Sequence, residues 1–274
     1  MSSGAEPSFD LSGRTAIVTG GAGILGRRFC KALAERGARV AVVDVDGDAA
    51  QELAKKIEVD LGTETLGVAC DVADLDSVDA MLATVLDRFG NIEILHNNAA
   101  SKSSSLDAFF APFEEYSLKT WREVTAVNLD GMFLVAQAVG RRMLQQGKGG
   151  SIIMTASIYG VVAPDQRIYE GSQYMGRPIN SPAVYSATKA AVVGLARHLA
   201  ALWAEHAIRV NALTPGGIES GQNEAFRSRY ASRVPMARMG RVDELTGALI
   251  YLASDASSYV TGQNLIVDGG LTCW

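Results

Sequence analysis

The chain has 274 residues, of which 48% are hydrophobic and 20% charged, so it can bury a full-sized core, and wholesale disorder is excluded. The 30 acidic residues outnumber the 25 Lys and Arg residues, which argues against general nucleic-acid binding, because no excess of cations is present to neutralise phosphates. No apolar run approaches the roughly 18 residues that a membrane span needs, and the N-terminus does not resemble a signal peptide.

The first half of the sequence alternates short apolar segments with longer amphipathic ones. The apolar segments predict strands at 14–19, 38–44, 66–71 and 92–96, and the amphipathic segments predict helices at 25–36, 48–61 and 75–89. Strands that are apolar throughout and are separated by helices indicate a parallel sheet that is covered on both faces.

The second half continues this alternation to the end of the chain. Helices are predicted at 117–146, 182–206 and 242–253, and strands at 151–156, 208–213 and 264–268. A single doubly wound, Rossmann-fold α/β domain therefore accounts for residues 13–274, and residues 1–12 are expected to form a flexible tail. Two long polar segments, 158–181 and 219–239, interrupt the pattern after predicted strands, where such sheets bind their ligands.

A glycine-rich turn at residues 19–26 follows the first predicted strand. Gly21, Gly23 and Gly26 have the spacing that lets a backbone approach a pyrophosphate, while the next helix directs its N–H groups at the negative charge. Asp44 ends the second strand, where a carboxylate binds a ribose hydroxyl and repels a 2′-phosphate. The pattern predicts a dinucleotide site that prefers NAD to NADP. A plain glycine turn with a solvated Asp44 is the alternative.

Tyr185 and Lys189 lie four positions apart at the start of a predicted helix, so both side chains lie on one face. A phenol has a pKa of about 10, and a nearby ammonium lowers it by stabilising the phenolate, so the pair can transfer protons. The same spacing by itself also fits an ordinary solvated helix face.

The cysteines and histidines are scattered through the sequence. Cys30, Cys70 and Cys273 show no metal-ligand spacing, which predicts a reducing cytoplasm and no metal site. His96 ends a buried strand beside two asparagines and is interpreted as a structural hydrogen-bonding residue, not as a base.

Several motifs follow one another in a specific order. They are the turn 19–26, Asp71-Val72, the run Asn97-Asn98-Ala99-Ala100, Asn128, Ser157, Tyr185 with Lys189, and Pro215-Gly216. With them the chain resembles the classical short-chain dehydrogenase/reductase family over nearly its whole length. Motifs in the correct order are far more specific than any one of them alone.

The resemblance implies a catalytic set of four residues. Tyr185 is expected to donate or accept the substrate's hydroxyl proton, Lys189 to lower the Tyr185 pKa and hold the nicotinamide ribose, and Ser157 to hydrogen-bond the reacting oxygen. Asn128 is expected to hold a water that passes the proton from Lys189 to solvent.

The resemblance also implies which residues contact the cofactor. Asp71 and Val72 are expected at the adenine, Asn98 supports the adenine side, and residues 214–220 line the nicotinamide. The expected cofactor-binding residues are Thr19, Gly20, Gly21, Gly23, Ile24, Leu25, Gly26, Asp44, Asp71, Val72, Asn98, Ala99, Tyr185, Lys189, Pro215, Gly216, Ile218 and Ser220.

Three features depart from the family pattern. Ile24 stands where the family has Gly, Ala100 also replaces a usual Gly, and Tyr185 follows Ser157 by 28 positions, roughly twice the family's gap. An insertion at about 158–181 is therefore expected on the substrate side, with a lid at about 219–239. The polar composition of the insertion favours a sugar, sugar acid or polyol as substrate. A surface loop or a subunit contact is the alternative.

The sequence thus predicts an NAD-dependent oxidoreductase that moves hydride between a secondary alcohol and a ketone. The glycine spacing leaves open a nucleotide-sugar epimerase or dehydratase. Such enzymes usually have a larger C-terminal substrate domain, whereas only about 60 residues follow Pro215 here. A non-enzymatic, NAD-sensing regulator is the other alternative. Family resemblance implies a homotetramer, with the apolar helix 182–206 at an interface and Trp274 either reaching a neighbour's site or packing locally.

Overall fold

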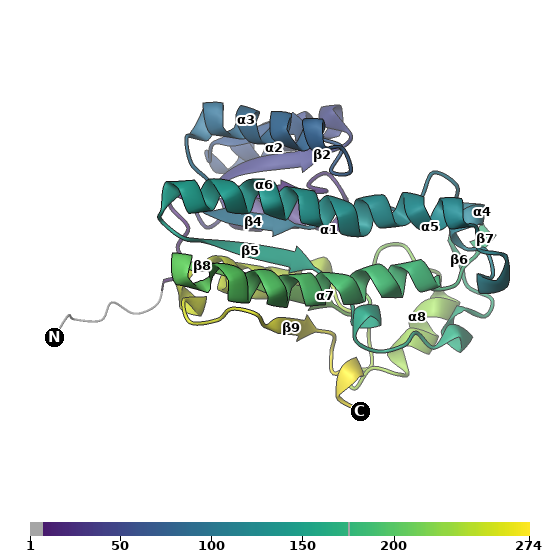
Figure 1. The fold of residues 1–274 in the computed structure, drawn as a ribbon. Coiled ribbons are helices and arrows are strands. Elements are labelled where there is room, and N and C mark those ends of the chain that lie inside the picture. Colours follow the sequence, from purple (N-terminus) through teal and green to yellow (C-terminus); the bar gives the residue numbers. More distant parts are fainter. Residues whose placement is uncertain (1–7, 175) are drawn as a thin grey trace.

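The computed structural model of the protein describes residues 8–174 and 176–274. Within them, seven parallel strands form one sheet in the order β3-β2-β1-β4-β5-β8-β9 (Figure 1). The strands are β1 (Thr15–Thr19), β2 (Arg39–Asp44), β3 (Thr65–Ala69), β4 (Ile94–Asn97), β5 (Gly150–Thr155), β8 (Ile208–Pro215) and β9 (Asn264–Val267). The strand order reverses between β1 and β4, and at such a point the carboxyl ends of the strands leave a crevice for a ligand.

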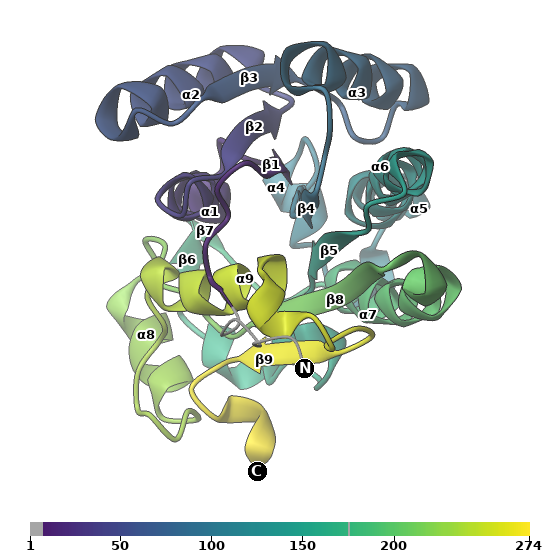
Figure 2. The same ribbon diagram turned by 90° about the vertical axis from the view of Figure 1, so that its left-hand side faces the viewer.

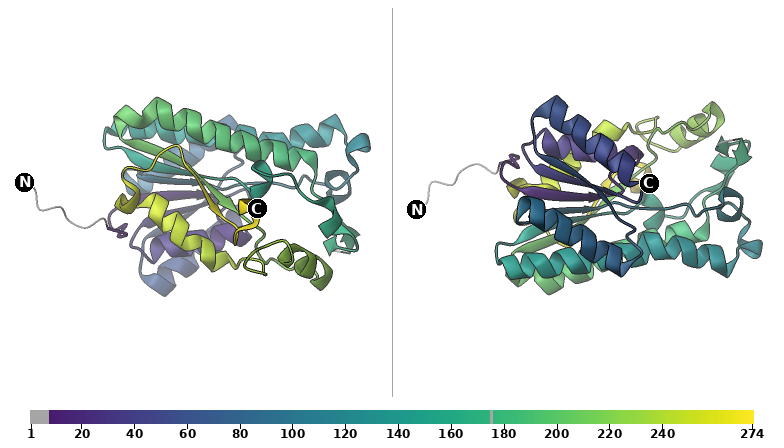
Figure 3. Two further views of the ribbon diagram at one scale, coloured as in Figure 1. Left: turned by 90° about the horizontal axis from the view of Figure 1, so that it is seen from below. Right: turned by 90° about the horizontal axis from the view of Figure 1, so that it is seen from above.

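Helices cover both faces of the sheet (Figures 2 and 3). One layer contains α1 (Ile24–Ala34), α2 (Gly47–Leu61) and α9 (Thr246–Ala253), and the other contains α3 (Leu75–Phe89), α6 (Gly131–Gln146) and α7 (Ala183–Trp203). Each layer buries an apolar cluster against the strands, which explains why the strands are apolar throughout. The fold is therefore the doubly wound Rossmann fold that the alternating pattern predicts.

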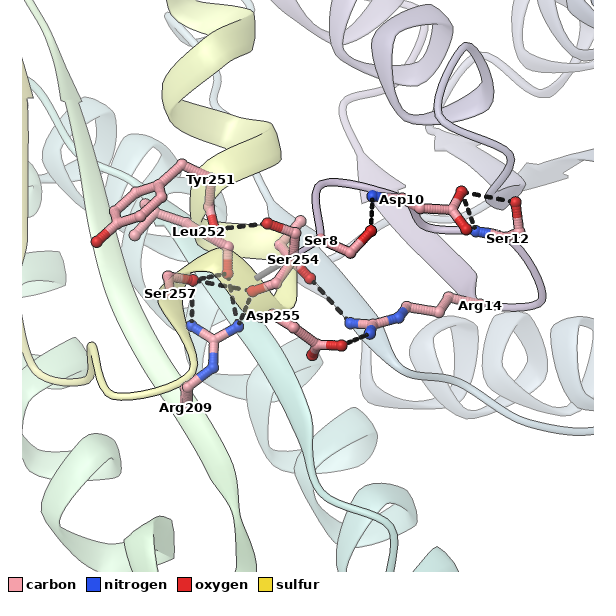
Figure 4. Close-up of polar contacts among 11 residues, drawn as sticks. Ser8, Asp10, Ser12, Arg14, Arg209, Tyr251, Leu252, Ser254, Asp255 and Ser257 are labelled. Carbon is pink, nitrogen blue, oxygen red and sulfur yellow. Dashed lines mark hydrogen bonds and ion pairs between the residues drawn. The ribbon is translucent and has the colours of Figure 1, made fainter. Parts of the chain in front are cut away.

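Two arginines hold the C-terminal end of α9 against the amino ends of the strands (Figure 4). Arg209 of β8 donates to the Leu252 carbonyl oxygen at 2.9 Å and to the Ser254 carbonyl oxygen at 3.2 Å. Arg14, next to β1, donates to the Asp255 carboxylate at 2.6 Å. Cations are favourable at the negative end of a helix dipole, so these contacts fix the C-terminal end of α9 near the amino ends of the strands.

Several predicted elements differ in detail from the observed ones. The predicted helix 117–146 is interrupted, because α5 (Leu118–Thr125) joins α6 through a π turn at Ala126–Asp130. The helix predicted from Val242 begins as a 3₁₀ turn and becomes α-helical only at Thr246. None of the helices in the described part of the chain is both long and apolar enough to span a membrane.

The predicted tail of residues 1–12 ends earlier than expected. Residues 1–7 lie outside the described part of the chain, but Leu11 is fully buried in the core cluster beneath α1. The Leu11 N–H also donates to the Arg36 carbonyl oxygen at 2.8 Å. The packed domain therefore starts at Leu11, because this one apolar side chain reaches the core.

The two polar segments fold beyond the carboxyl ends of the strands (Figure 1). The first contains 3₁₀ turns and a short hairpin of β6 (Gln173–Tyr174) and β7 (Arg177–Pro178), and the second contains α8 (Glu224–Ala231). α4 (Leu106–Phe109) lies at the same end. None of these elements was predicted, because each is short and is held by contacts between distant parts of the chain.

Candidate active site

The glycine turn connects β1 to α1 and leaves the first N–H groups of the helix without a side-chain cap. Gly23 is the N-cap and has no side chain that could accept from them. A Cβ on Gly26 would lie 2.0 Å from the Gly20 carbonyl oxygen, and Gly20 itself has a φ of +62°. Only glycine fits both positions, and the uncapped N–H groups form a site for an anionic group.

The turn forms one wall of a cleft of about 550 Å3 at the carboxyl ends of β1, β2 and β4. Ten predicted cofactor residues line it: Gly20, Gly23, Ile24, Leu25, Gly26, Asp44, Asp71, Val72, Asn98 and Ala99. The Asp44 carboxylate accepts from the Ala22 N–H at 3.0 Å, so it both supports the turn and faces the cleft. A phosphate cradle with a carboxylate at the next strand end has the donor set that a dinucleotide requires.

Two further residues of this motif lie beneath the cleft. Thr19 is fully buried, and its hydroxyl accepts from the N–H groups of Asn98 at 2.9 Å and Ala99 at 3.1 Å. The Gly21 N–H donates to the Val43 carbonyl oxygen at 2.9 Å. They set the position of the turn but are not part of the cleft wall.

The predicted catalytic side chains converge at the end of β5. Lys189 is 2% exposed, and its Nζ donates to the Thr155 carbonyl oxygen at 2.8 Å and lies 5.9 Å from the centre of the Tyr185 ring. Burial lowers the Lys189 pKa to about 8. The 3₁₀ turn that begins after Ser157 packs closely on α7, because a Cβ on Gly160 would lie 2.5 Å from the Lys189 carbonyl carbon.

Two effects act on the pKa of the Tyr185 phenol. Burial raises the Tyr185 pKa above its usual value, and a hydrogen bond with Ser157 acts in the opposite direction. The Lys189 ammonium donates to the Thr155 carbonyl oxygen and lies 5.9 Å from the centre of the Tyr185 ring. That Lys189 lowers the Tyr185 pKa stays a prediction.

Asn128 lies in the π turn between α5 and α6 and is fully buried. Its Oδ1 accepts from the Ser101 N–H at 2.7 Å, and its Nδ2 donates to the Ser101 carbonyl oxygen at 3.2 Å. Both ends of the amide are thus used to fix the loop after β4.

The segment after β8 lies at the other side of the strand ends. Pro215 ends β8, the Gly216 N–H donates to the Val267 carbonyl oxygen at 2.9 Å, and Ile218 lines a small pocket together with Gly216. Ser220 is exposed, and its hydroxyl accepts from Gln222 at 3.0 Å. Ser220 is therefore the one predicted cofactor residue of this segment that points to solvent.

Residues 158–181 and 219–239 pack against each other, and we call the two segments together the cap. Ile158, Ile168, Phe226, Tyr230, Val234 and Met239 form its apolar cluster with Leu271. Arg233 of the second segment pairs with Asp165 of the first at 3.0 Å. Trp274 donates to the Arg233 carbonyl oxygen at 3.2 Å, so the C-terminus contacts the cap of its own chain.

Two tyrosines that the sequence does not single out form hydrogen bonds in the cap. Tyr159 accepts from the Tyr169 hydroxyl at 3.2 Å, and Tyr230 accepts from the Gly217 N–H. Burial raises the pKa of both Tyr159 and Tyr230, so both hydroxyls stay protonated.

The chain is similar to known proteins over nearly its whole length. A family model described as enoyl-(acyl carrier protein) reductase matches residues 20–272. D-Threitol dehydrogenase of Mycolicibacterium smegmatis is 39% identical in an alignment of 269 residues that covers 96% of this chain and 95% of that protein.

Two solved structures are also similar to the protein. A short-chain type dehydrogenase/reductase from Mycobacterium marinum has a TM-score of 0.84 at 37% identity, covering 97% of this chain and 98% of that one. A gluconate 5-dehydrogenase from Burkholderia cenocepacia, in complex with NADP and tartrate, has a TM-score of 0.85 at 36% identity and the same coverage.

Proposed function

The chain belongs to the short-chain dehydrogenase/reductase family, and on that premise we propose that it oxidises a secondary alcohol of a polyol or sugar acid to the ketone with NAD, and catalyses the reverse reduction. The observation that carries this proposal is the continuity of cleft and catalytic residues. Asn98 lines the cleft and accepts from the Thr155 hydroxyl at 3.1 Å, and the Thr155 carbonyl oxygen accepts from Lys189.

The cofactor assignment rests on the donors around the cleft. The uncapped N–H groups of α1 would hold the pyrophosphate, Asp44 the adenosine ribose, and Asp71 with Val72 the adenine. Asp44 favours NAD, because a carboxylate repels the 2′-phosphate of NADP. One relative of the chain was solved with NADP, so membership of the family does not decide between the two cofactors. We therefore base the preference for NAD on Asp44 alone.

The reaction divides between the cofactor and three side chains. The bound dinucleotide would supply the acceptor for the hydride of the carbinol carbon. Ser157 holds the substrate oxygen, and Tyr185 takes its proton in oxidation and returns it in reduction. The raised Tyr185 pKa suits proton donation in the reductive direction. Lys189, whose pKa is about 8, is assigned to hold the nicotinamide ribose.

Asn128 is assigned a place on the path of this proton to solvent. Both ends of its side-chain amide are hydrogen-bonded to the Ser101 backbone. We therefore propose that Asn128 acts by holding the π turn at Ala126–Asp130 in place. The irregular backbone of such a turn leaves groups that can bind water, and π turns in helices are frequent at functional sites.

The substrate class is supported by the cap and by the relatives. We assign residues 11–274 to the catalytic domain, 158–181 to a substrate-side insertion and 219–239 to a lid. The insertion lines a cavity of about 670 Å3 together with the start of α7. Polar side chains of this lining include Gln166, Glu170 and Asn180.

Polar lining groups favour a ligand that carries hydroxyls over an apolar one, because hydroxyls can form hydrogen bonds with them. Two of the relatives are named for their action on D-threitol and on gluconate, and the second was solved with tartrate. All three compounds carry hydroxyls on neighbouring carbons.

We further propose that the protein is a cytoplasmic homotetramer. Apolar side chains on one set of helices are exposed, with Leu118 at 61%, Phe133 at 46% and Leu202 at 57%. A subunit interface on α5, α6 and α7 would cover them. The free thiols of Cys30, Cys70 and Cys273 support this location, because disulfides are rare in the cytoplasm.

The proposal is tested by following NADH formation from NAD with a panel of D-threitol, other polyols, sugar acids and hydroxysteroids. We expect turnover of a polyhydroxylated compound that is lost in Tyr185→Phe and kept in Tyr259→Phe, whose side chain is fully exposed. An enzyme that binds NAD but gives no turnover dependent on Tyr185 contradicts the proposal. Conversion of a nucleotide sugar without net NADH would favour an epimerase.

A further inference from the structure

His96 is a buried histidine that the proposed reaction does not use. It lies in β4, is fully buried and packs its ring against Phe29, with 4.6 Å between the ring centres. Its Nε2 lies 2.8 Å from the Thr155 hydroxyl oxygen, and its Nδ1 has no hydrogen-bond partner among the described residues. A buried histidine with a hydrogen bond on only one of its two ring nitrogens is destabilising relative to an apolar side chain of the same size. The contact with Thr155 is therefore a candidate for a functional role.

The direction of that contact is fixed by the groups around Asn98. The Asn98 Nδ2 lies 3.1 Å from the Thr19 carbonyl oxygen and 3.4 Å from the Gly20 carbonyl oxygen. Carbonyl oxygens only accept, so the amide nitrogen must face the glycine turn and the amide oxygen must face Thr155. The orientation of the Asn98 amide is thereby determined without reference to any hydrogen position.

The remaining proton positions follow from this orientation. The Asn98 Oδ1 accepts from the Thr155 hydroxyl at 3.1 Å, and a hydroxyl has only one proton to donate. The Thr155 oxygen must then accept from His96, so His96 is the neutral tautomer with its proton on Nε2. Burial lowers the His96 pKa to about 3, in agreement with a ring that stays neutral.

This line of hydrogen bonds joins the two halves of the site. At one end, Asn98 holds the carbonyl oxygens of the glycine turn that would cradle the pyrophosphate. At the other end, the backbone carbonyl of Thr155 holds the Lys189 ammonium at 2.8 Å. The ends of β1, β4 and β5 and the catalytic helix are therefore tied together through one threonine, whose free lone pair is taken by His96.

We propose that His96 is a positioning residue of the cofactor site: by donating from Nε2 to the Thr155 hydroxyl, it fixes Asn98 against the glycine turn and so sets the affinity for the dinucleotide. The inference rests on the proposed function for the identity of the ligand. An apolar residue would fill the same space but would leave the Thr155 hydroxyl free to turn away from Asn98.

The experiment compares two substitutions of His96 in the full chain. His96→Leu removes the donor and keeps the volume, whereas His96→Gln keeps an N–H donor at similar reach. We expect His96→Leu to raise the dissociation constant of NADH, measured by fluorescence titration, about five- to tenfold, the size of one hydrogen bond. His96→Gln should restore the affinity to within about threefold. The KM for the alcohol at saturating dinucleotide should change little.

Thr155 provides a second pair of variants. Thr155→Val should weaken NADH binding at least as much as His96→Leu, and the double variant should not be additive, because both changes break one network. Thr155→Ser keeps the hydroxyl and serves as the matched control. Additive effects of the His96 and Thr155 substitutions would overturn the proposal.

A measurement independent of activity tests the proton assignment. Long-range ¹⁵N NMR of the histidine rings, assigned with His96→Gln, should show the Nε2–H tautomer unchanged from pH 5 to pH 9. A proton on Nδ1, or equal NADH affinity in wild type and His96→Leu, would overturn the proposal. A wild-type chain that binds NADH but oxidises no alcohol would contradict the proposed reaction alone, and the affinity and NMR results would still decide the role of His96.

Discussion

Replacement of Lys189 by methionine is predicted to stabilise the protein without its cofactor while abolishing turnover. Lys189 is buried, and its pKa falls from 10.5 to about 8 in the folded chain. At neutral pH the charged form is therefore disfavoured in the folded state by about 3 kcal/mol. The substitution also removes the hydrogen bond to the Thr155 carbonyl oxygen, which contributes about 1 kcal/mol. The net gain for Lys189→Met is about 2 kcal/mol at pH 7.

The pH dependence of this gain has a definite sign. Below pH 8 Lys189 is charged in both the folded and the unfolded chain, and the whole penalty is present. Between pH 8 and 10.5 the folded protein has lost the proton and the unfolded chain still binds it, so the wild type becomes more stable as the pH rises. The advantage of Lys189→Met should therefore shrink across this range.

Urea denaturation at a fixed protein concentration, at several values of pH, measures the effect. Lys55→Met is the control, because Lys55 is exposed on α2 and its replacement should change the free energy of unfolding by less than about 0.5 kcal/mol. A Lys189→Met protein that is no more stable than wild type at pH 7, or whose advantage stays constant up to pH 10, would refute the reasoning.

Three other substitutions test the cofactor cleft and the cap. Gly26→Ala should weaken NADH binding at least tenfold in a fluorescence titration, because its Cβ would lie 2.0 Å from a backbone oxygen of the glycine turn. Unchanged affinity would exclude the turn as the phosphate site. Asp44→Ser keeps an acceptor for the turn but removes the negative charge, so the ratio of kcat/KM for NADP to that for NAD should rise about tenfold or more. An unchanged ratio would show that Asp44 does not select the cofactor. Arg233→Gln breaks the pair with Asp165 between the two cap segments and should raise the KM for the alcohol about two- to fivefold without changing that for NAD, whereas Arg229→Gln, on the exposed side of α8, should change neither. Equal effects of the two arginine substitutions would argue against a role of the cap in substrate binding.

The features that could be predicted from the sequence depend on residues that are close together in the chain. The glycine turn needs a strand, three glycines and a helix start, all within residues 15–26, and the structure places them as predicted. The Tyr185 and Lys189 pair needs only one helical turn. The strand pattern is also local, because a strand covered on both faces must be apolar at every position.

What could not be predicted depends on packing between distant segments. The π turn around Asn128 is one extra residue in a helix, and its local sequence resembles that of any helix. The direction of the Tyr185 pKa shift depends on burial of the phenol and on its hydrogen bond with Ser157, 28 positions earlier in the chain. The cap is held by an ion pair and an apolar cluster that join residues about 70 positions apart, which no spacing rule detects.

The central claim is that Tyr185 and the dinucleotide act on one carbinol group, Tyr185 on its hydroxyl proton and the dinucleotide on the hydride of its carbon. Its most direct test uses D-threitol that carries deuterium on its secondary carbons, incubated with NAD and the purified protein. The account predicts deuterium on the nicotinamide ring, detected by NMR, together with a ketone product, and neither with Tyr185→Phe. Ketone formation without label on the nicotinamide, or equal label with Tyr185→Phe, would contradict it.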